Sequence, residues 1–283
     1  MTVLVPTSLD EALFALADLP DALVLAGGTD AMVEVNMGNR KPVDVVSVNR
    51  VSELRSWTYD PVAATVHIGA AVTYSELMQP PLAELLPALA EAARTVGSPQ
   101  IRNAGTLGGN LGTCSPAGDG LPVLSALDAV VHLASTRGER SLPVGEFMVG
   151  VKRTARERDE LITGVTVGVL DGWQGYSKVG VRNAMVIALA TACVAVDTPG
   201  RSVRVAIGSV GTTILRCDEA ELFAAAEVDF DGRGASTATV TRFGELAAAH
   251  SRPIDDHRSS AAYRRHAIGV LSSRLLRRAF PHE

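Results

Sequence analysis

The chain has 283 residues, with 26 Lys or Arg and 31 Asp or Glu, so its formal net charge is −5. This charge argues against a general nucleic-acid binder, which needs a basic surface to neutralise phosphates. Hydrophobic residues make up 47% and charged residues 20% of the chain, which is typical of a globular protein and excludes a disordered one. No apolar run approaches the roughly 18 residues of a membrane span, and the first ten residues lack the pattern of a secretory signal.

The three cysteines lie far apart and form no CxxC pattern; they are Cys114, Cys193 and Cys217. Their odd number and spacing predict reduced thiols in a cytoplasmic protein. They also argue against an iron–sulfur centre carried by this chain. The histidines are scattered without metal-ligand spacing, so we expect no metal site.

The first 55 residues predict a small α/β unit. Short apolar runs predict strands at residues 3–5, 22–26 and 43–48, and helical periodicity predicts helices at residues 11–19 and 31–37. The connections are short, and the second strand ends in paired glycines. Strand, helix, strand, tight turn, helix and strand therefore follow one another as in an α/β fold.

The next segment, residues 56–170, predicts strands at 65–71 and 161–169 and helices at 74–78 and 82–96. Between them lies a glycine-rich stretch at residues 97–120. It contains too much glycine for a helix or a central strand and is too apolar for a disordered linker. We therefore expect a long ordered loop, which is usually functional.

The last third, residues 171–283, has a different pattern. It predicts strands at 176–181, 185–196 and 203–210, followed by helices at 219–226, 243–250 and 260–280. A three-stranded sheet with helices on one face fits this order. Arg264 and Arg265 lie on the last helix, where we expect them at the surface or at an interface.

The first glycine segment, Ala26 to Asp30, has the sequence AGGTD at the end of a predicted strand. Paired glycines expose consecutive backbone N–H groups, and such a concavity suits a phosphate or pyrophosphate. It contains neither GxGxxG nor a Gly-Lys-[Ser/Thr] sequence. The alternative is a strand-to-helix turn that needs glycine for its shape.

The second glycine segment, residues 101–119, begins with IRNAGTLGGN and ends with SPAGD. Thr106, Asn110, Thr113 and Asp119 offer hydroxyls, an amide and a carboxylate at short intervals. These groups could bind a diphosphate and a ribose or ribityl chain. The alternative is a buried crossover loop between two subdomains.

Together, AGGTD, IRNAGTLGGN and SPAGD resemble the FAD-binding medium subunit of the molybdenum hydroxylases, the family of xanthine dehydrogenase and carbon monoxide dehydrogenase. The resemblance continues at residues 142–147, 160–162, 176–182 and 255–265, so it spans nearly the whole chain in order. Ala31-Met32 and Gly118 depart modestly from common family usage.

The resemblance implies an α+β fold. Two subdomains form an FAD-binding fold of the vanillyl-alcohol oxidase type, and a C-terminal domain of antiparallel sheet and helices closes over the flavin. The expected boundaries are 1–55, 56–170 and 171–283.

The resemblance also implies site residues. The first glycine segment would wrap the pyrophosphate of FAD, through Val24, Leu25, Ala26, Gly27, Gly28, Thr29, Asp30 and Ala31. The second would hold the diphosphate and ribityl side, through Ile101, Gly105, Thr106, Gly109, Asn110 and Thr113. Asp119 would accept hydrogen bonds from the adenosine ribose, and Leu161 and Ile162 would pack near the adenine.

Two residues are implied at the reacting end of the cofactor. Lys178 would lie near the pyrimidine end of the isoalloxazine, where a cation favours the anionic reduced flavin and raises its potential. Tyr176, on the same strand face, would stack near the ring. The alternative for Tyr176 is a place in the core.

Family membership implies an electron-transfer role within a complex. A molybdenum-cofactor large subunit would oxidise the substrate, and a small subunit with two [2Fe–2S] clusters would relay electrons to FAD on this chain. The flavin would pass them to NAD, oxygen, a quinone or another acceptor, within a heterohexamer. A stand-alone flavin oxidoreductase and a flavin-free scaffold subunit are the alternatives.

Overall fold

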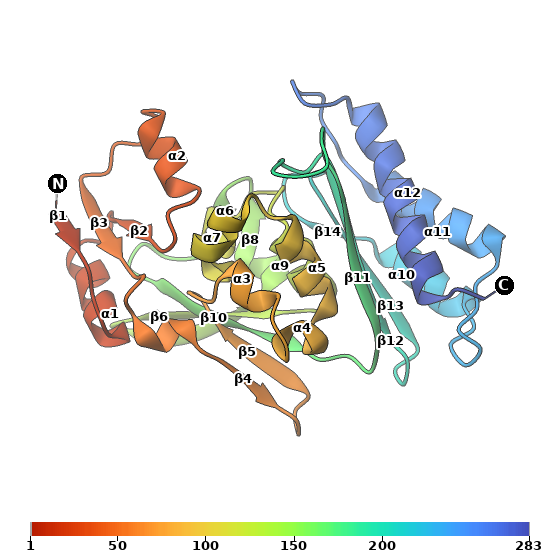
Figure 1. Cartoon of the computed structure of the whole chain (residues 1–283), viewed down its shortest axis with the longest axis horizontal. Coiled ribbons are helices and arrows are strands. Elements are labelled where there is room, and N and C mark those ends of the chain that lie inside the picture. Colours follow the sequence, from red (N-terminus) through yellow and green to blue (C-terminus); the bar gives the residue numbers. More distant parts are fainter. Residues whose placement is uncertain (1, 283) are drawn as a thin grey trace.

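The computed structural model describes residues 2–282. Figure 1 shows three parts in succession along the molecule: a small parallel sheet at the N-terminal end, a central antiparallel sheet covered by helices, and a second antiparallel sheet backed by the C-terminal helices. Among the helices of residues 2–282, none combines the length and apolar character needed to cross a bilayer.

The N-terminal unit is a parallel sheet in the strand order β1-β3-β2. Its elements are β1 (Thr2–Leu4), α1 (Leu9–Asp18), β2 (Leu23–Leu25), α2 (Ala31–Asn36) and β3 (Asp44–Ser47). The Ser8 hydroxyl accepts a hydrogen bond from the Glu11 amide and so fixes the start of α1. Leu16 of α1 is buried in one cluster with Val46 of β3. The predicted elements of this unit are confirmed.

The central sheet is antiparallel, in the strand order β4-β5-β10-β6-β7. Its strands are β4 (Trp57–Asp60), β5 (Thr65–Gly69), β6 (Val130–Ser135), β7 (Gly138–Pro143) and β10 (Leu161–Gly168). The short 3₁₀-helix η1 (Ser52–Arg55) precedes this sheet. A small hairpin of β8 (Met148–Gly150) and β9 (Arg153–Thr154) lies beside it.

Helices cover one face of the central sheet (Figure 1). They are α3 (Tyr74–Leu77), α4 (Leu82–Leu85), α5 (Pro87–Thr95), α6 (Pro99–Ala104), α7 (Leu107–Thr113), α8 (Gly120–Ala126) and α9 (Val144–Phe147). The single helix expected at 82–96 is interrupted at Leu86, because Pro87 has no N–H to continue the hydrogen bonding of α4.

The expectation that residues 97–120 form no helix is wrong, because α6 and α7 lie within them. Each has a regular start: Ser98 caps α6 ahead of Pro99, and Thr106 caps α7. Glycine is retained in α7 because the helix packs closely on the backbone at Ala70. A Cβ on Gly108 would lie 2.5 Å from the carbonyl oxygen of Ala70.

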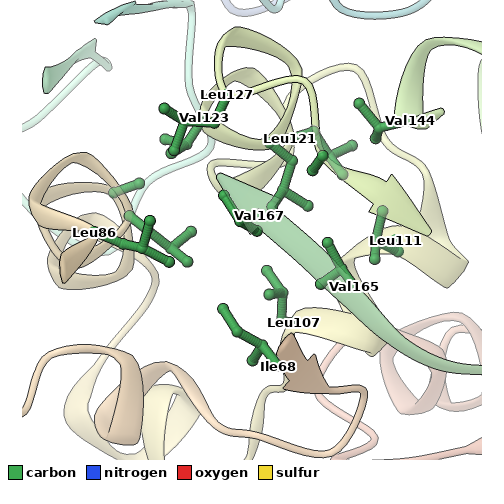
Figure 2. Packing of buried hydrophobic residues seen from close by; sticks show 14 of the residues in the cluster. Ile68, Leu86, Leu107, Leu111, Leu121, Val123, Leu127, Val144, Val165 and Val167 are labelled. Carbon is green, nitrogen blue, oxygen red and sulfur yellow. The ribbon is translucent and has the colours of Figure 1, made fainter. Parts of the chain in front are cut away.

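The main core lies between these helices and the central sheet, as Figure 2 shows. Val165 and Val167 alternate along β10 on the helix-facing side and are buried. Leu107 and Leu111, one helical turn apart on α7, are fully buried against the same cluster. This apolar packing holds the glycine-rich helix in place.

The C-terminal sheet is antiparallel, in the order β11-β12-β13-β14. Its elements are β11 (Gly172–Val179), β12 (Ala190–Asp197), β13 (Ser202–Gly208), β14 (Leu215–Arg216), α10 (Asp218–Glu227), α11 (Thr237–His250) and α12 (Ala261–Ala279). The predicted helices are confirmed. The strand expected at 185–196 begins only at Ala190, and β14 adds a fourth strand.

The expectation that the helices of this segment lie on one face of the sheet is confirmed for α10–α12, and helices of the central part cover the opposite face. Ala192 and Val194 of β12 belong to the cluster shared with α10–α12, whereas Cys193 and Ala195 belong to the main core on the opposite face. Helices α5 and α8 contact that second face. Burial on both faces explains why residues 192–196 of β12 are all apolar.

Arg264 is buried, not at the surface as expected. Its guanidinium donates to the carbonyl oxygens of Leu189 (2.9 Å) and Ser209 (3.2 Å) and to the Asp256 carboxylate (2.8 Å). The backbone N–H of Arg258 is the main cause that lowers the pKa of Asp256 to about 2, and Arg264 and Ser259 also contribute. This network ties α12 to the start of β12.

The Asp256 network predicts an acid-dependent stability. Because folding lowers the pKa of Asp256 from 3.8 to about 2, its stabilisation is complete above about pH 4 and is lost as the pH falls towards 2. Asp256→Asn should lower the free energy of unfolding at neutral pH and flatten its decline across that acid range. Urea denaturation at several pH values measures both effects, and parallel declines in the two proteins would contradict the prediction.

Candidate functional site

A cavity of about 1070 Å³ lies where the two glycine segments meet. Its volume lies just above the usual range for ligand and cofactor pockets, about 300–1,000 Å³. Most of the predicted site residues line it, namely Val24, Leu25, Ala26, Gly27, Gly28, Thr29, Asp30, Ala31, Ile101, Thr106, Gly109, Asn110, Thr113, Asp119, Leu161 and Ile162. The structure thus brings together residues from distant parts of the chain.

The first glycine segment presents free backbone donors to this cavity. Strand β2 ends at Leu25 and α2 begins at Ala31. Within residues 2–282, the five consecutive N–H groups from Gly27 to Ala31 donate to no protein acceptor. Gly28 has φ +71°, a backbone shape that favours glycine and turns successive amides towards one side. Such a row of donors suits an anion.

The second glycine segment forms a wall whose leading amides are already used. The N–H groups of Leu107 and Gly108 donate to the carbonyl oxygens of Val72 (3.1 Å) and Ala70 (2.9 Å). The Gly109 N–H donates to the Thr106 hydroxyl at 2.9 Å. The Gly109 amide is therefore already engaged by the Thr106 hydroxyl and is not a free donor for a diphosphate.

What Gly109 contributes is space. A Cβ added there would meet only the Thr106 hydroxyl, at 3.1 Å. Asn110 accepts a hydrogen bond from the Gly120 amide through Oδ1 at 3.2 Å, which leaves its side-chain NH₂ as the available donor. The Thr113 hydroxyl donates to Asp30 at 3.3 Å. Side-chain groups and the open space at Gly109, rather than free amides, therefore characterise this wall.

The two segments touch at one point. A Cβ on Gly27 would lie 1.7 Å from the carbonyl oxygen of Ala104. Only glycine allows this approach. Gly105, next along the chain, lies behind the contact, beside Tyr74 and Thr29, and does not line the cavity. Gly105 was predicted to contact the cofactor, but in the structure it packs between Tyr74 and Thr29 and is not part of the cavity wall.

Asp119, Lys178 and Tyr176 form a buried polar cluster. The Lys178 ammonium lies 2.8 Å from one Asp119 oxygen, and the Tyr176 hydroxyl donates to the other at 2.7 Å. Lys178 also donates to the carbonyl oxygen of Thr95 at 3.2 Å. The Asp119 and Lys178 side chains are only 9% and 7% exposed. Burial raises the pKa of the Asp119 carboxyl, and Lys178 and Tyr176 oppose that rise.

This cluster changes two sequence predictions. Because Asp119 and Lys178 are in contact, they cannot serve opposite ends of an extended dinucleotide, the adenosine ribose and the isoalloxazine. Tyr176 lies behind Asp119 and lines a separate, smaller cavity with Glu91. Its ring is therefore not offered for stacking in the main cavity, and its alternative place in the core describes it better.

Several lining residues were not predicted. They include Tyr74, the ion pair of Lys152 with Glu34 (2.8 Å), Arg40 and Arg156. The Arg156 guanidinium donates to the backbone carbonyl oxygens of Glu157, Arg158 and Glu160. None of them belongs to a glycine-rich motif, so no pattern in the sequence indicated them.

Metal ligation has no support among the described residues. Side chains of His, Cys, Asp and Glu form no group of three or more that could hold an ion there. Cys114, Cys193 and Cys217 are buried and unpaired. The cavity thus offers hydrogen-bond donors, apolar walls and the Asp119 carboxylate, whose ion-pair partner Lys178 lies behind it and does not line the cavity.

Comparison with known proteins agrees with this geometry. Residues 1–169 match the family model for the FAD binding domain in molybdopterin dehydrogenase, and residues 176–279 match that for the CO dehydrogenase flavoprotein C-terminal domain. The chain is 38% identical over 193 residues to the nicotinate dehydrogenase FAD-subunit of Eubacterium barkeri, a match that covers 65% of this chain and 64% of that protein. It is 30% identical to the glyceraldehyde dehydrogenase medium chain of Sulfolobus acidocaldarius, over 95% of each chain.

The structure is also similar to a solved one. Reconstituted CO dehydrogenase from Oligotropha carboxidovorans aligns with a TM-score of 0.90 and 27% sequence identity. The alignment covers 100% of this chain and 98% of that one. The whole fold, and not the cavity alone, is therefore shared.

The close contact of Gly27 with Ala104 predicts that a side chain at this position destabilises the protein. In Gly27→Ala the new methyl overlaps the Ala104 carbonyl, so the two segments must separate, and we expect the free energy of unfolding to fall by about 1–3 kcal/mol. Gly145→Ala in α9 is the matched control, because a Cβ there meets nothing within 4 Å. Chemical denaturation compares the two. Equal stabilities would mean that the close approach is not needed.

Proposed function

Because this chain belongs to the family of FAD-binding subunits of molybdenum hydroxylases, the xanthine dehydrogenase and carbon monoxide dehydrogenase type, we propose that it carries the electron-transfer FAD of such an oxidoreductase complex. It would accept electrons from the iron–sulfur clusters of a partner subunit and deliver them to an acceptor such as NAD, oxygen or a quinone. FAD, when bound, supplies a carrier able to exchange electrons singly or in pairs.

The observation that carries the proposal is the row of unpaired amides from Gly27 to Ala31. Five adjacent donors that face a cavity and have no protein acceptor fit the oxygens of a pyrophosphate. The opposite wall, at Gly109, leaves room for the same group. On this arrangement the first glycine segment binds the pyrophosphate, and Asn110 and Thr113 bind from the second.

The residues beyond the two glycine segments are the basis for assigning the two ends of the dinucleotide. Leu161 and Ile162 offer apolar contact and line the cavity, as the adenine end requires. The Lys178–Asp119 pair would then stand at the ribityl and isoalloxazine end. Lys178 acts there as half of an ion pair, and not as the free cation that the sequence suggested. Its effect on the flavin is therefore that of an oriented dipole.

The surface around the cavity supports a role inside a complex. Helix α2 has no buried residue, and Val33, which lines the cavity, is 50% exposed. Across the cavity, Met185 and Ile187 are 55% and 52% exposed. Apolar side chains gathered at the rim of a site fit a surface that another subunit covers.

We propose that the partners are a molybdenum-cofactor large subunit and a small subunit with [2Fe–2S] clusters. No group of potential metal ligands occurs among residues 2–282, so the clusters would belong to the partner. The heterohexameric assembly, the cytoplasmic location and the division of the chain at residues 55 and 170 also stay predictions.

Purification from the native host tests the proposal directly. We expect the chain to be isolated with two companion subunits and to show flavin and iron–sulfur absorbance together. Flavin absorbance with this chain alone would favour a stand-alone flavin oxidoreductase. Colourless protein containing the intact chain would count against the FAD site itself.

The ion pair predicts opposite effects of its two charges. Lys178→Met should lower the midpoint potential of the bound flavin, and Asp119→Asn should raise it, because each leaves one charge beside the ring. In a two-electron couple, about 30 mV corresponds to ~1.4 kcal/mol. The double variant, which removes both charges, is the control and should stay near the wild type.

The pH dependence sharpens this test. Burial raises the pKa of Asp119 and Lys178 opposes that rise, so removing Lys178 raises the pKa further and favours the uncharged carboxyl. The fall in potential of Lys178→Met should therefore become larger as the pH increases and the carboxyl loses its proton. Unchanged potentials in all three variants, with FAD still bound, would place the pair at the adenosine end instead.

A further inference from the structure

Tyr74 is a residue of the cavity that no motif indicated. It is the first residue of α3, directly after Thr73, which caps the helix together with Glu76. Its backbone pairs with the second glycine segment: the Tyr74 N–H donates to the carbonyl oxygen of Gly105 at 3.0 Å. A bridge between Thr73 and Thr106 continues this pairing. The ring is therefore fixed relative to the glycine wall.

The side chain of Tyr74 is buried, but its hydroxyl has no protein partner. The residue is 5% exposed and lines the main cavity. In residues 2–282 no hydrogen bond to or from its phenol oxygen is present. The other tyrosine of this region, Tyr176, donates its hydroxyl to Asp119. Unlike the enclosed Thr191 hydroxyl, the Tyr74 oxygen is not a fully buried atom, and because the residue lines the cavity its hydroxyl is available to a molecule bound there.

The surroundings of Tyr74 keep its phenol group protonated, so that its O–H can donate a hydrogen bond. Burial, and secondly the charge of Asp119, raise the pKa of its phenol, so the O–H stays protonated. Both Asp119 oxygens already accept hydrogen bonds, one from Tyr176 and one from Lys178. The Tyr74 hydroxyl is thus free to donate to a bound molecule on the side of the cavity where Asp119 lies.

We propose that the Tyr74 hydroxyl donates a hydrogen bond to the flavin half of the bound FAD, to an oxygen of the ribityl chain or of the pyrimidine ring. The inference rests on the proposed function, which places the Asp119–Lys178 pair at that half. Tyr74 then acts as a binding and positioning residue that adds a neutral donor beside a buried ion pair. Its aromatic ring also closes the core behind the cavity.

Binding of FAD and of its two halves tests this assignment. Tyr74→Phe removes one oxygen and keeps the ring that packs in the core. The full-length apoprotein is titrated with FAD and with FMN by flavin fluorescence, and with ADP by competition against FAD. We expect affinities for FAD and FMN to fall by about three- to tenfold, and the affinity for ADP to stay unchanged.

The control is Tyr59→Phe on β4, whose side chain is exposed and does not line the cavity; it should bind all three ligands as the wild type does. Wild-type affinities of Tyr74→Phe for FAD and FMN would overturn the inference. A loss confined to ADP would also overturn it, because it assigns Tyr74 to the adenosine half. If the wild-type chain bound none of the three ligands, the proposed function itself would fail.

Discussion

The candidate site depends on one backbone contact, the approach of Gly27 to the carbonyl of Ala104. It brings the amides that follow β2 next to the helices α6 and α7, which lie more than 70 residues further along the chain. Any side chain at Gly27 would separate the two walls. The amides would then face open solvent instead of a cavity, and a row of unpaired donors would lose its geometry for a single anion.

The second requirement is the burial of Asp119 and Lys178. Asp119 directly precedes α8, and Lys178 lies on β11, so the pair forms only when the C-terminal sheet packs against α5 and α8. A carboxylate in such a place would be unfavourable alone, and the ammonium compensates it. The pair therefore links the closing sheet to the cavity, and a change in either residue affects both packing and the local field.

The sequence predicted the elements of the N-terminal unit and the C-terminal helices, and most of the site residues it named line the cavity, because glycine pairs, caps and apolar periodicity are local signals. Helices α6 and α7 were missed, since their glycines have poor helix propensity and are retained for contacts such as that of Gly108 with Ala70. The contact of Asp119 with Lys178 joins residues that are distant in the chain, and no local spacing reveals it. Tyr74 carries no motif at all, and its place follows only from the pairing of its backbone with Gly105.

The composite nature of the cavity has a consequence for synthesis of the chain on the ribosome. Its lining extends from Ala22 to Ile187, and the β5–β10 pairing that supports it joins residues 65–69 to residues 164–168. Contacts of such long sequence separation form slowly. The amides of the first glycine segment are among the earliest parts to emerge. The cavity that would hold a pyrophosphate against them is complete only after about two thirds of the protein has been made. Cofactor loading is thus a late event, tied to completion of the fold.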